Sequence, residues 1–252
     1  MTGTGAPVDA TRATFTVDRF DADAFGFVSP AALSGYLQDA AGRSAESLDF
    51  GLTRLNARGL TWVLSRQRLV LDAPIRLGDS LVVETWPSGI DRLAALRDFR
   101  LSRDGATVGR ALTTWLVIDL ATRRPSRPDR LLPPERHAQS EHVLPVEAPP
   151  PPALGSAALQ RRFQVRYADI DVNRHVTASS YVAWVTEAVE EAEWRSLRLA
   201  SLDVQFLAEA FLGQEVRSGS SPDGGGARLH AVVREEDGKE LARARTTWAA
   251  RE

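Results

Sequence analysis

Apolar and polar residues alternate near the start of the chain, over Thr14–Phe20, and then change to a helical spacing. Alternation places successive side chains on opposite faces of a strand, whereas intervals of three and four residues place them on one face of a helix. Ser29 and Pro30 are typical of a helix start, because serine can accept a hydrogen bond from a free amide and proline has no amide to leave unpaired. The apolar stripe of this predicted helix comprises Leu33, Tyr36, Leu37, Ala40 and Ala41. Alternating segments then predict strands over Trp62–Leu71, Ser80–Trp86, Ala94–Arg103 and Val108–Asp119.

The second half of the chain has the same order of patterns. An alternating segment, Arg162–Tyr167, precedes a second helical stripe, for which Thr177 or Ser179 is a candidate N-cap. That stripe comprises Tyr181, Trp184, Val185, Ala188, Val189 and Ala192. A strand, a long helix and then several antiparallel strands predict an α+β fold, in which each half is a sheet wrapped around one buried helix.

Three short matches, in the same order in both halves, indicate an internal duplication. The interval from Asp23 to Ala40 equals that from Asp171 to Ala188. The other two matches pair Leu77–Asp79 with Leu212–Gln214, and Gly109–Trp115 with Ala242–Trp248. We therefore predict an N-terminal unit over residues 10–132 and a C-terminal unit over residues 161–252.

The segment Pro133–Gln160 separates the two predicted units and contains the proline run Pro149–Pro152. Proline fixes φ and lacks an amide proton, so such a segment cannot join a central strand or continue a helix. We expect an extended, fairly stiff linker over residues 133–160.

Composition and charge exclude several classes of protein. The 252 residues are 43% hydrophobic and 25% charged, the balance of a chain that folds around an apolar core. No apolar run is long enough for a membrane span, and Met1–Thr11 lacks the apolar stretch of a secretory signal. A net charge of -2 argues against nucleic-acid binding, and we interpret the arginine cluster around Arg123 and Arg124 as a solvent-facing loop. The absence of cysteine excludes disulfides, cysteine-ligated zinc and a cysteine nucleophile, and is compatible with a cytoplasmic location.

Asp171, Asn173 and His175 occupy alternate positions just before the second predicted helix. If this segment is extended, all three side chains share a face and can surround one bound group. Asp169 has the same parity, so the spacing alone does not select the working carboxylate. The free amides and positive partial charge of a helix N-terminus suit a developing oxyanion on a thioester carbonyl. Aspartate and asparagine are also common as turn and cap residues, so a purely structural role stays open at this point.

The first copy has apolar residues where the second copy is polar. Phe25 and Phe27 correspond in the repeat to Asn173 and His175. If these two positions served only to form the turn, polar residues would suit them in both copies. We therefore interpret the second unit as catalytic, and the first unit as degenerate in its loop and suited to bind an acyl chain. The residues predicted to contact that chain are Phe25, Phe27, Leu33 and Leu37.

Glu209 is a further candidate for acid–base chemistry. It lies within the apolar segment Phe206–Leu212, and carboxylates in apolar surroundings are frequent general acids or bases. A solvent-facing position on a half-buried strand is an equally good interpretation of this pattern.

The segment Asp169–Val176, followed by Tyr181 and Trp184, resembles the Asp-Leu-Asp-Val-Asn-Gln-His-Val motif of plant and bacterial acyl-acyl carrier protein thioesterases. Tyr36–Ala41 in the first predicted helix also resembles that family, and the resemblance covers nearly the whole chain. It implies a tandem hot-dog fold and hydrolysis of fatty acyl carrier thioesters to free fatty acid, with no metal or organic cofactor. The catalytic residues that it implies are Asp171, Asn173, His175 and Glu209.

Three departures from the plant pattern concern substrate preference more than the catalytic set. Ala210 stands where plant members have cysteine, so no cysteine mechanism is available. Thr177 stands where plant members have asparagine, and Leu207–Ala208 replaces an Arg-Arg pair.

A second resemblance concerns the first unit. Asp21–Val28 is similar to the loop of single-unit 4-hydroxybenzoyl-CoA-type thioesterases, which implies a catalytic carboxylate at Asp23. The alternatives to an acyl-carrier thioesterase are therefore a coenzyme A thioesterase, a hot-dog hydratase or dehydratase, and a non-catalytic acyl-binding protein.

The expected partner is an acyl thioester of either acyl carrier protein or coenzyme A. Carrier proteins are acidic, and a basic patch on an enzyme speeds encounter with an acidic partner. Two fused units supply internally the pairing that single units obtain by dimerising, so a monomer or a homodimer is expected. The candidate docking residues are Arg161, Arg162, Arg166, Arg195 and Arg198.

Overall fold

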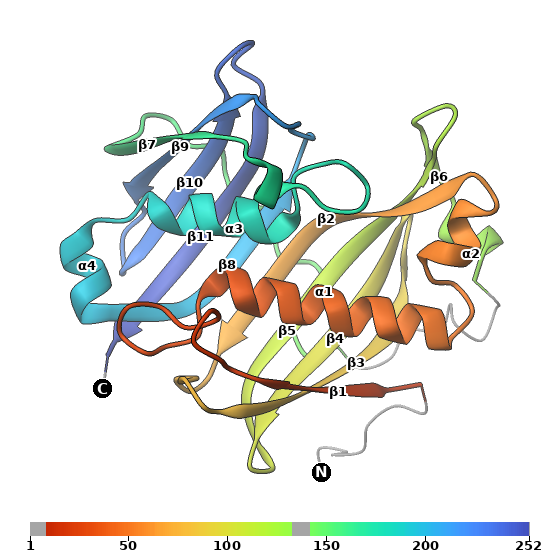
Figure 1. Ribbon diagram of the computed structural model, residues 1–252, viewed down its shortest axis with the longest axis horizontal. Coiled ribbons are helices and arrows are strands. Elements are labelled where there is room, and N and C mark those ends of the chain that lie inside the picture. Colours follow the sequence, from red (N-terminus) through yellow and green to blue (C-terminus); the bar gives the residue numbers. More distant parts are fainter. Residues whose placement is uncertain (1–8, 133–141, 252) are drawn as a thin grey trace.

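The computed structural model describes residues 9–132 and 142–251 (Figure 1). Their strands form one sheet in the order β1-β3-β4-β5-β2-β8-β11-β10-β9-β7, with β6 paired to β5 beside this path. The first half contributes β1 (Thr11–Thr16), α1 (Pro30–Ser47), α2 (Leu52–Asn56), β2 (Leu60–Leu71), β3 (Ser80–Asp91), β4 (Ala94–Arg103), β5 (Ala106–Asp119), β6 (Pro125–Ser126) and the 3-10 turn η1 (Pro128–Arg130). The second half contributes β7 (Leu159–Gln164), the 3-10 turn η3 (Tyr167–Asp169), α3 (Ala178–Glu187), α4 (Glu191–Ser196), β8 (Leu197–Phe206), β9 (Glu215–Pro222), β10 (Ala227–Arg234) and β11 (Glu240–Ala250).

The two halves of the sheet repeat one strand order from the outer edge to the centre. The first runs β1-β3-β4-β5-β2 and the second runs β7-β9-β10-β11-β8. They join where β2 pairs antiparallel with β8, from Arg66 opposite Gln205 to Val70 opposite Ser201. α1 and α3 lie side by side against this sheet (Figure 1). The internal duplication is thus visible as a pseudo-twofold arrangement about the β2–β8 junction.

α1 begins where the sequence predicted. Ser29 is its N-cap, and the serine hydroxyl accepts a hydrogen bond from the amide of Ala32 at 3.1 Å, while Pro30 occupies the first helical position. Leu33 and Leu37 of the predicted stripe are each 1% exposed, and burying a leucine side chain contributes roughly 1.5–3 kcal/mol. No helix in the described part of the chain is long and apolar enough to cross a membrane.

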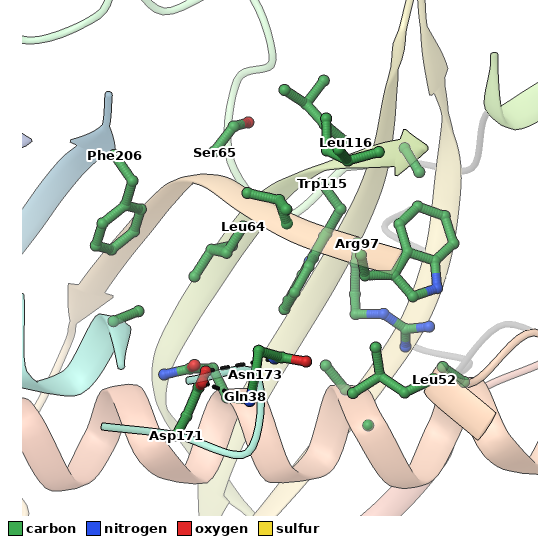
Figure 2. A pocket seen from close by; sticks show the side chains of 18 of the residues that line it. Gln38, Leu52, Leu64, Ser65, Arg97, Trp115, Leu116, Asp171, Asn173 and Phe206 are labelled. Atoms are coloured by element: carbon green, nitrogen blue, oxygen red, sulfur yellow. Dashed lines mark hydrogen bonds between the residues drawn. The ribbon is translucent and has the colours of Figure 1, made fainter. Parts of the chain in front are cut away.

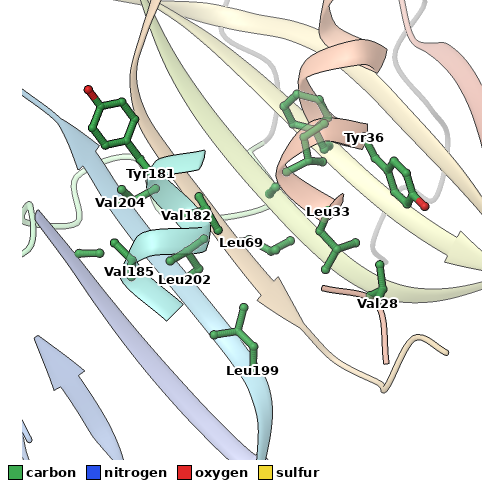
Figure 3. Packing of buried hydrophobic residues seen from close by; sticks show 14 of the residues in the cluster. Val28, Leu33, Tyr36, Leu69, Tyr181, Val182, Val185, Leu199, Leu202 and Val204 are labelled. Atoms are coloured by element: carbon green, nitrogen blue, oxygen red, sulfur yellow. The ribbon is translucent and has the colours of Figure 1, made fainter. Parts of the chain in front are cut away.

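The main hydrophobic core contains residues of both units. Leu69 on β2 lies opposite Leu202 on β8, and both are 1% exposed. Figure 3 shows Leu69 between Leu33 of α1 and Val182 of α3, and Leu202 next to Val182 and Val185 of α3. Because one cluster spans the strand junction, the two helices are packed over a common core.

The strands that precede the loops at residues 21–28 and 169–176 both end earlier than the alternation of apolar and polar residues predicted. β1 ends at Thr16 and β7 at Gln164. The next residue in each unit, Val17 or Val165, donates its amide to the main chain of a second loop, at Asp79 (2.9 Å) or Gln214 (2.8 Å). These bonds lead the chain out of the strand ladder, and they place the repeated segments 77–79 and 212–214 at equivalent positions.

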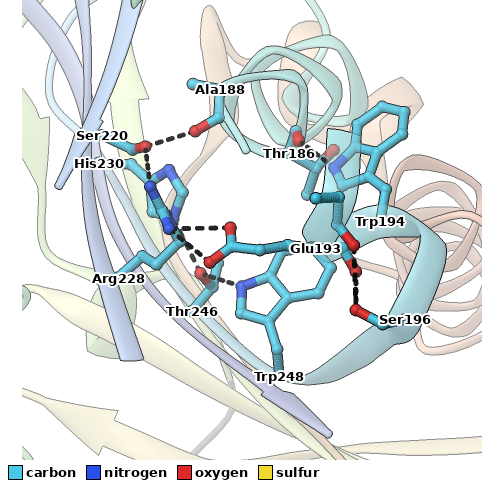
Figure 4. Close-up of polar contacts among 11 residues, drawn as sticks. Thr186, Ala188, Glu193, Trp194, Ser196, Ser220, Arg228, His230, Thr246 and Trp248 are labelled. Carbon is cyan, nitrogen blue, oxygen red and sulfur yellow. Dashed lines mark hydrogen bonds and ion pairs between the residues drawn. The ribbon is translucent and has the colours of Figure 1, made fainter. Parts of the chain in front are cut away.

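The second helix is shorter than predicted. α3 ends at Glu187, and Ala192 is exposed at the start of α4, so the predicted stripe does not belong to one helix. The hydroxyl of Ser220 donates to the carbonyl of Ala188, which helps to end the helix, and the indole of Trp194 donates to Thr186 at 3.2 Å (Figure 4). At the other end, Thr177 is the N-cap residue, although its side chain makes no capping hydrogen bond.

Residues 142–158 of the predicted linker form no strand or helix and pack against the sheet, whereas its last two residues, 159 and 160, already belong to β7. The carboxylate of Asp98 on β4 contacts His142 Nδ1 and accepts from the Val143 amide, both at 2.8 Å. Arg66 on β2 donates to the carbonyls of Ala148 and Pro149 at 2.8 and 2.7 Å. The remainder of the predicted linker, residues 133–141, lies outside the described residues.

Candidate active site

The motif loop of the second unit is a turn rather than the extended segment that the alternating pattern suggested. The amide of Asp171 donates to the carbonyl of His175 at 2.9 Å, and the amide of Arg174 donates back to Asp171 at 3.0 Å. Arg174 has φ of +65°, a left-handed conformation that is uncommon outside glycine. The turn forms because the Asp171 carboxylate captures the Asn173 amide at 2.8 Å, as aspartate often does two residues ahead of itself.

The turn brings the loop next to the chain that follows β8. The amide of Val176 donates to the carbonyl of Ala210 at 3.1 Å, and Ile170 and Val176 form an isolated bridge. Consequently Glu209, which precedes Ala210, lies beside His175 although 34 residues separate them in the sequence. The polar groups of two segments therefore meet at one place.

Glu209 does not lie on a strand, because β8 ends at Phe206. One carboxylate oxygen, Oε1, lies 3.5 Å from Nδ1 of His175. The other oxygen, Oε2, accepts from Nη2 of Arg123 at 2.5 Å, so the side chain is not the freely solvated surface carboxylate of the alternative interpretation. The His175 ring also packs edge-on against Phe211, with 5.4 Å between the ring centroids. The imidazole thus lies between a carboxylate on one side and an aromatic ring on another.

The four candidate catalytic residues line one cavity of about 740 Å³. Most of the other lining side chains are apolar, and many belong to the first unit. In Figure 2, Asp171 and Asn173 lie on one side of this cavity, with Leu64 and Trp115 above them and Leu52 farther along. The cavity therefore presents a polar group of side chains on one side of a largely apolar space. Its polar candidates are Asp171, Asn173, His175 and Glu209.

The four residues predicted to contact an acyl chain do not line this cavity. Leu33 and Leu37 are fully packed in the main core, and Phe25 and Phe27 lie beneath the guanidinium of Arg251. The reason is the pseudo-twofold arrangement, which places the loop of the first unit at a different position from the loop of the second. The first unit does contribute to the cavity, through another face of α1.

That face of α1 was missed by the sequence reasoning. The wall residues recur at intervals of three and four and are mostly small, which leaves room beside the helix. This spacing, offset from the core stripe, is the signal that could have identified them. They are Gln38, Ala41, Gly42, Ala45 and Glu46, of which Ala41 is shared with the predicted core stripe.

Arg123 lies in a solvent-facing loop, as predicted, but its contact with Glu209 was missed. It follows β5 in the first unit, yet it lines the cavity and contacts Glu209 of the second unit. The arginine beside it, Arg124, is exposed as well but does not line the cavity.

Arg97 on β4 is a buried cation in the cavity wall (Figure 2). Its Nη1 donates to the hydroxyls of Ser44 at 2.9 Å and Thr85 at 3.3 Å, and no carboxylate among residues 9–132 and 142–251 pairs with it. Burial lowers the pKa of Arg97 to about 10, so the guanidinium stays charged at neutral pH. The cavity is therefore apolar along most of its walls and cationic at this point.

Tyr181 of α3 lines the cavity beside the candidate residues. Burial raises the pKa of its hydroxyl, so the group stays protonated at neutral pH. It donates to the carbonyl of Ala208 at 3.3 Å, next to Glu209. Tyr181 thus helps to fix the segment that carries the carboxylate and is not available as a base.

The equivalent loop of the first unit forms the same turn, but its aspartate carboxylate is bonded to other groups of the protein. The amide of Asp23 donates to Phe27 at 2.7 Å, and Gly26 has φ of +77°, matching Arg174 of the second unit. The Asp23 carboxylate accepts from Arg251 at 3.0 Å and from the Phe25 and Phe27 amides. Asp23 is therefore engaged by protein groups at the position that the second resemblance made catalytic.

The arginines predicted to dock a carrier are mostly tied to neighbours. Arg166 pairs with Asp169 at 3.1 Å, and Arg195 pairs with Glu191 at 2.6 Å. The remaining three also contact protein groups or are partly enclosed: Arg162 lies 3.4 Å from Glu235, Arg161 donates to Gln160, and Nη1 of Arg198 is buried. The side chains of Arg162, Arg166 and Arg195 nevertheless stay 79%, 73% and 67% exposed, so they remain accessible to an acidic partner.

Known proteins resemble this chain over nearly its whole length. A palmitoyl-acyl carrier protein thioesterase of Cuphea hookeriana is 26% identical over 234 residues, which are 86% of this chain and 53% of that protein. A dodecanoyl-[acyl-carrier-protein] hydrolase of Umbellularia californica is 27% identical over 255 residues, or 94% of this chain and 67% of that protein. The chain spans about half the length of the first curated relatives that it matches.

Solved structures show the same fold. The 12:0-ACP thioesterase from Umbellularia californica superposes with a TM-score of 0.85 at 25% identity, covering 98% of this chain and all of that one. An acyl-ACP thioesterase from Bacteroides thetaiotaomicron gives a TM-score of 0.84 at 22% identity, covering 96% and 98% of the two chains. The predicted tandem hot-dog fold is confirmed.

Two family models match successive parts of the sequence. The acyl-ACP thioesterase N-terminal domain matches residues 9–131, and the acyl-ACP thioesterase C-terminal domain matches residues 155–250. Together they cover most of the chain, and the chain belongs to the acyl-ACP thioesterase family.

Proposed function

We propose that this protein hydrolyses fatty acyl thioesters of acyl carrier protein, releasing a free fatty acid and the carrier thiol. The observation that carries the proposal is the cavity itself, in which Asp171, Asn173, His175 and Glu209 gather on one side of a largely apolar space. A thioester has the same division, with a polar reacting group at one end of an apolar chain. Membership of the family and the names of the relatives support the same reaction.

The proposed chemistry begins at the thioester carbonyl carbon, placed beside Asp171. Water adds its oxygen to that carbon, the carbon–sulfur bond breaks, and the thiol leaves with a proton. Asp171 either orients this water or attacks first, forming an acyl-enzyme anhydride that water then hydrolyses. Asn173 donates to Asp171 from its amide nitrogen at 3.4 Å and helps to hold the carboxylate.

His175 is the group best suited to move protons. Its Nδ1 faces Glu209, and a carboxylate at that distance favours the tautomer with hydrogen on Nδ1. Nε2 is then free to take a proton from water and return it to the leaving sulfur. In this scheme Glu209 prepares the water through His175, by fixing the orientation of the imidazole.

The first turn of α3 supplies donors for the developing oxyanion. Ala178, the first residue of α3, lines the cavity. The first amides of a helix have no partner inside the helix and carry a positive partial charge. A thioester oxygen on this side of the cavity would therefore be stabilised as negative charge accumulates on it.

The carrier and the cellular location are further parts of the proposal. Acyl carrier protein is the partner named for the relatives, and coenzyme A is the alternative carrier. The absence of cysteine is compatible with the cytoplasm, whereas the named plant relatives are chloroplastic. The internal pairing of two units supports a monomer, and a homodimer of such chains is the alternative.

Release of free thiol from matched acyl-carrier and acyl-coenzyme A substrates tests the proposal. We expect hydrolysis, with a higher kcat/KM for the carrier protein substrate at low ionic strength and an advantage that shrinks as salt rises. Equal kcat/KM values would make the protein a coenzyme A thioesterase. Binding of acyl chains without thiol release would favour the non-catalytic alternative, and hydration of an enoyl thioester would favour a hydratase.

A further inference from the structure

Arg123 connects the two units at the proposed active site. It belongs to the first unit, in the turn between β5 and β6, and its Nη2 lies 2.5 Å from Oε2 of Glu209. Eighty-six residues separate the two in sequence. Both side chains line the cavity, so this contact lies inside the proposed site rather than on a remote surface.

The turn that carries Arg123 is held in place by its own hydrogen bonds. Arg123 has φ of +57°, and its amide donates to the carbonyl of Asp119 at 2.8 Å. The Asp119 carboxylate accepts from the amides of Thr122 and Ala121 at 2.8 and 3.0 Å, and bonds from Thr122 hold the pKa of that carboxyl below its usual range. A non-glycine residue in a left-handed conformation persists only where its surroundings fix it. The guanidinium is therefore presented to Glu209 by a defined turn.

The two oxygens of Glu209 have different partners. Oε2 faces Arg123, and Oε1 faces Nδ1 of His175 at 3.5 Å. A charge-assisted bond from arginine is stronger than a neutral one and restrains the position of the carboxylate that accepts it. The side chains of Arg123 and Glu209 are 51% and 32% exposed, and partly exposed ion pairs contribute little to stability. The contact is thus better explained by orientation than by stability.

We propose that Arg123 is a positioning residue, which fixes Glu209 so that its second oxygen holds His175. This inference rests on the proposed thioesterase function and extends it. The first unit would then supply part of the catalytic arrangement as well as the wall of the acyl cavity. The glutamate would depend on a side chain from the other copy of the duplicated unit.

Steady-state kinetics of Arg123→Gln, Arg123→Lys and Arg124→Gln test this role. Arg124 is the matched control, because it is the adjacent exposed arginine and does not line the cavity. We expect Arg123→Gln to lower kcat about tenfold with KM changed less than about twofold, as for an interaction made mainly in the transition state. Arg123→Lys should recover part of kcat, and Arg124→Gln should match the unsubstituted protein. All three should keep the same unfolding temperature.

A double-mutant cycle with Glu209→Gln decides whether Arg123 acts through Glu209. If it does, Arg123→Gln should lower kcat little further once Glu209 is already replaced. Losses that multiply in the double variant would overturn the inference. A rise in KM for the carrier substrate with kcat unchanged would also overturn it, because Arg123 would then bind the carrier. Absence of thiol release by the unsubstituted protein is a separate result, which would reject the proposed function itself.

Discussion

Arg251, just after the last strand, donates from Nη2 to Oδ2 of Asp23 at 3.0 Å, across 228 residues of sequence. Its guanidinium lies 4.1 Å from the ring centroid of Phe25 and 4.8 Å from that of Phe27. Asp23 is the counterpart of Asp171 in the repeat. Both units form the same turn. In the first unit an arginine bonds to the aspartate of that turn, and in the second unit the aspartate lines the cavity.

This difference predicts which half carries the reaction. We expect Asp171→Asn and His175→Ala each to lose most thioester hydrolysis while remaining folded, because each removes a group on the polar side of the cavity. Asp23→Asn should retain most of the activity. Thiol release by the three purified variants, with circular dichroism as the check on folding, measures this. If Asp23→Asn abolishes turnover and Asp171→Asn does not, the active half is the first.

Replacing Glu209 should affect turnover more than substrate binding. Glu209→Gln keeps the size of the side chain but weakens its hold on His175, so we expect kcat to fall by about 100-fold or more with a smaller change in KM. Initial rates across a range of substrate concentrations separate the two constants. A loss of kcat under about threefold would show that the carboxylate has no catalytic part.

A side chain added at Gly42 should shorten the preferred acyl chain. Gly42 lines the cavity, and a Cβ at this position meets no atom within 4 Å, so Gly42→Leu can fold while filling the space beside α1. Each methylene that loses its place costs about 0.8 kcal/mol, so displacing two of them should lower kcat/KM for the longest accepted chain about tenfold or more.

Gly35→Leu is the matched control for this change. Gly35 is on the same helix, has the same open space at its Cβ and does not line the cavity. Its chain-length profile, measured with a ladder of acyl substrates, should stay unchanged, and so should that of Phe27→Ala. If Gly42→Leu and Gly35→Leu gave identical profiles, the acyl chain would not lie in this cavity.

His230 should make the protein less stable in acid. Burial, assisted by the charge of Arg228, lowers the pKa of His230 to about 3 from a usual value of 6.5. The folded protein then keeps the ring neutral while the unfolded chain binds a proton below pH 6.5, so the free energy of unfolding falls as pH falls from 6.5 toward 3. At pH 5 the loss from this group is about 2 kcal/mol relative to pH 7.5.

Urea unfolding at pH 7.5 and pH 5 measures that loss. In His230→Gln the free energy of unfolding should change less between the two pH values, whatever the stability of the variant at pH 7.5. The comparison within each variant removes the effect of the lost contact with Thr246, which lies 2.8 Å from Nε2. An equal decrease in both proteins would assign the acid sensitivity to other groups.

Sequence patterns predicted an element well where its boundaries depend on adjacent residues. The start of α1 follows from the residue types of Ser29 and Pro30, and β4 has the predicted bounds Ala94–Arg103. The end of α3 was wrong, since a hydroxyl on β9, that of Ser220, binds the carbonyl of Ala188. No pattern within the helix itself carries that information.

The candidate site was predicted in part. The alternating spacing of Asp171, Asn173 and His175 predicted that they lie together if their segment is extended. They do line one cavity, but a turn brings them there instead. Arg123 and the small residues of α1 were not predicted, because their place depends on how β2 meets β8. That junction is set by packing between distant segments and has no signature within either one.

The β2–β8 junction also has a consequence for how such a protein evolves. In a homodimer of single units, one gene encodes both halves, so an arginine that closes one loop would close the other as well. Covalent fusion frees the halves from that identity, because a mutation now appears once per molecule. Selection can then keep a reactive loop in one half while the other gives up its own chemistry, as Asp23 beneath Arg251 illustrates.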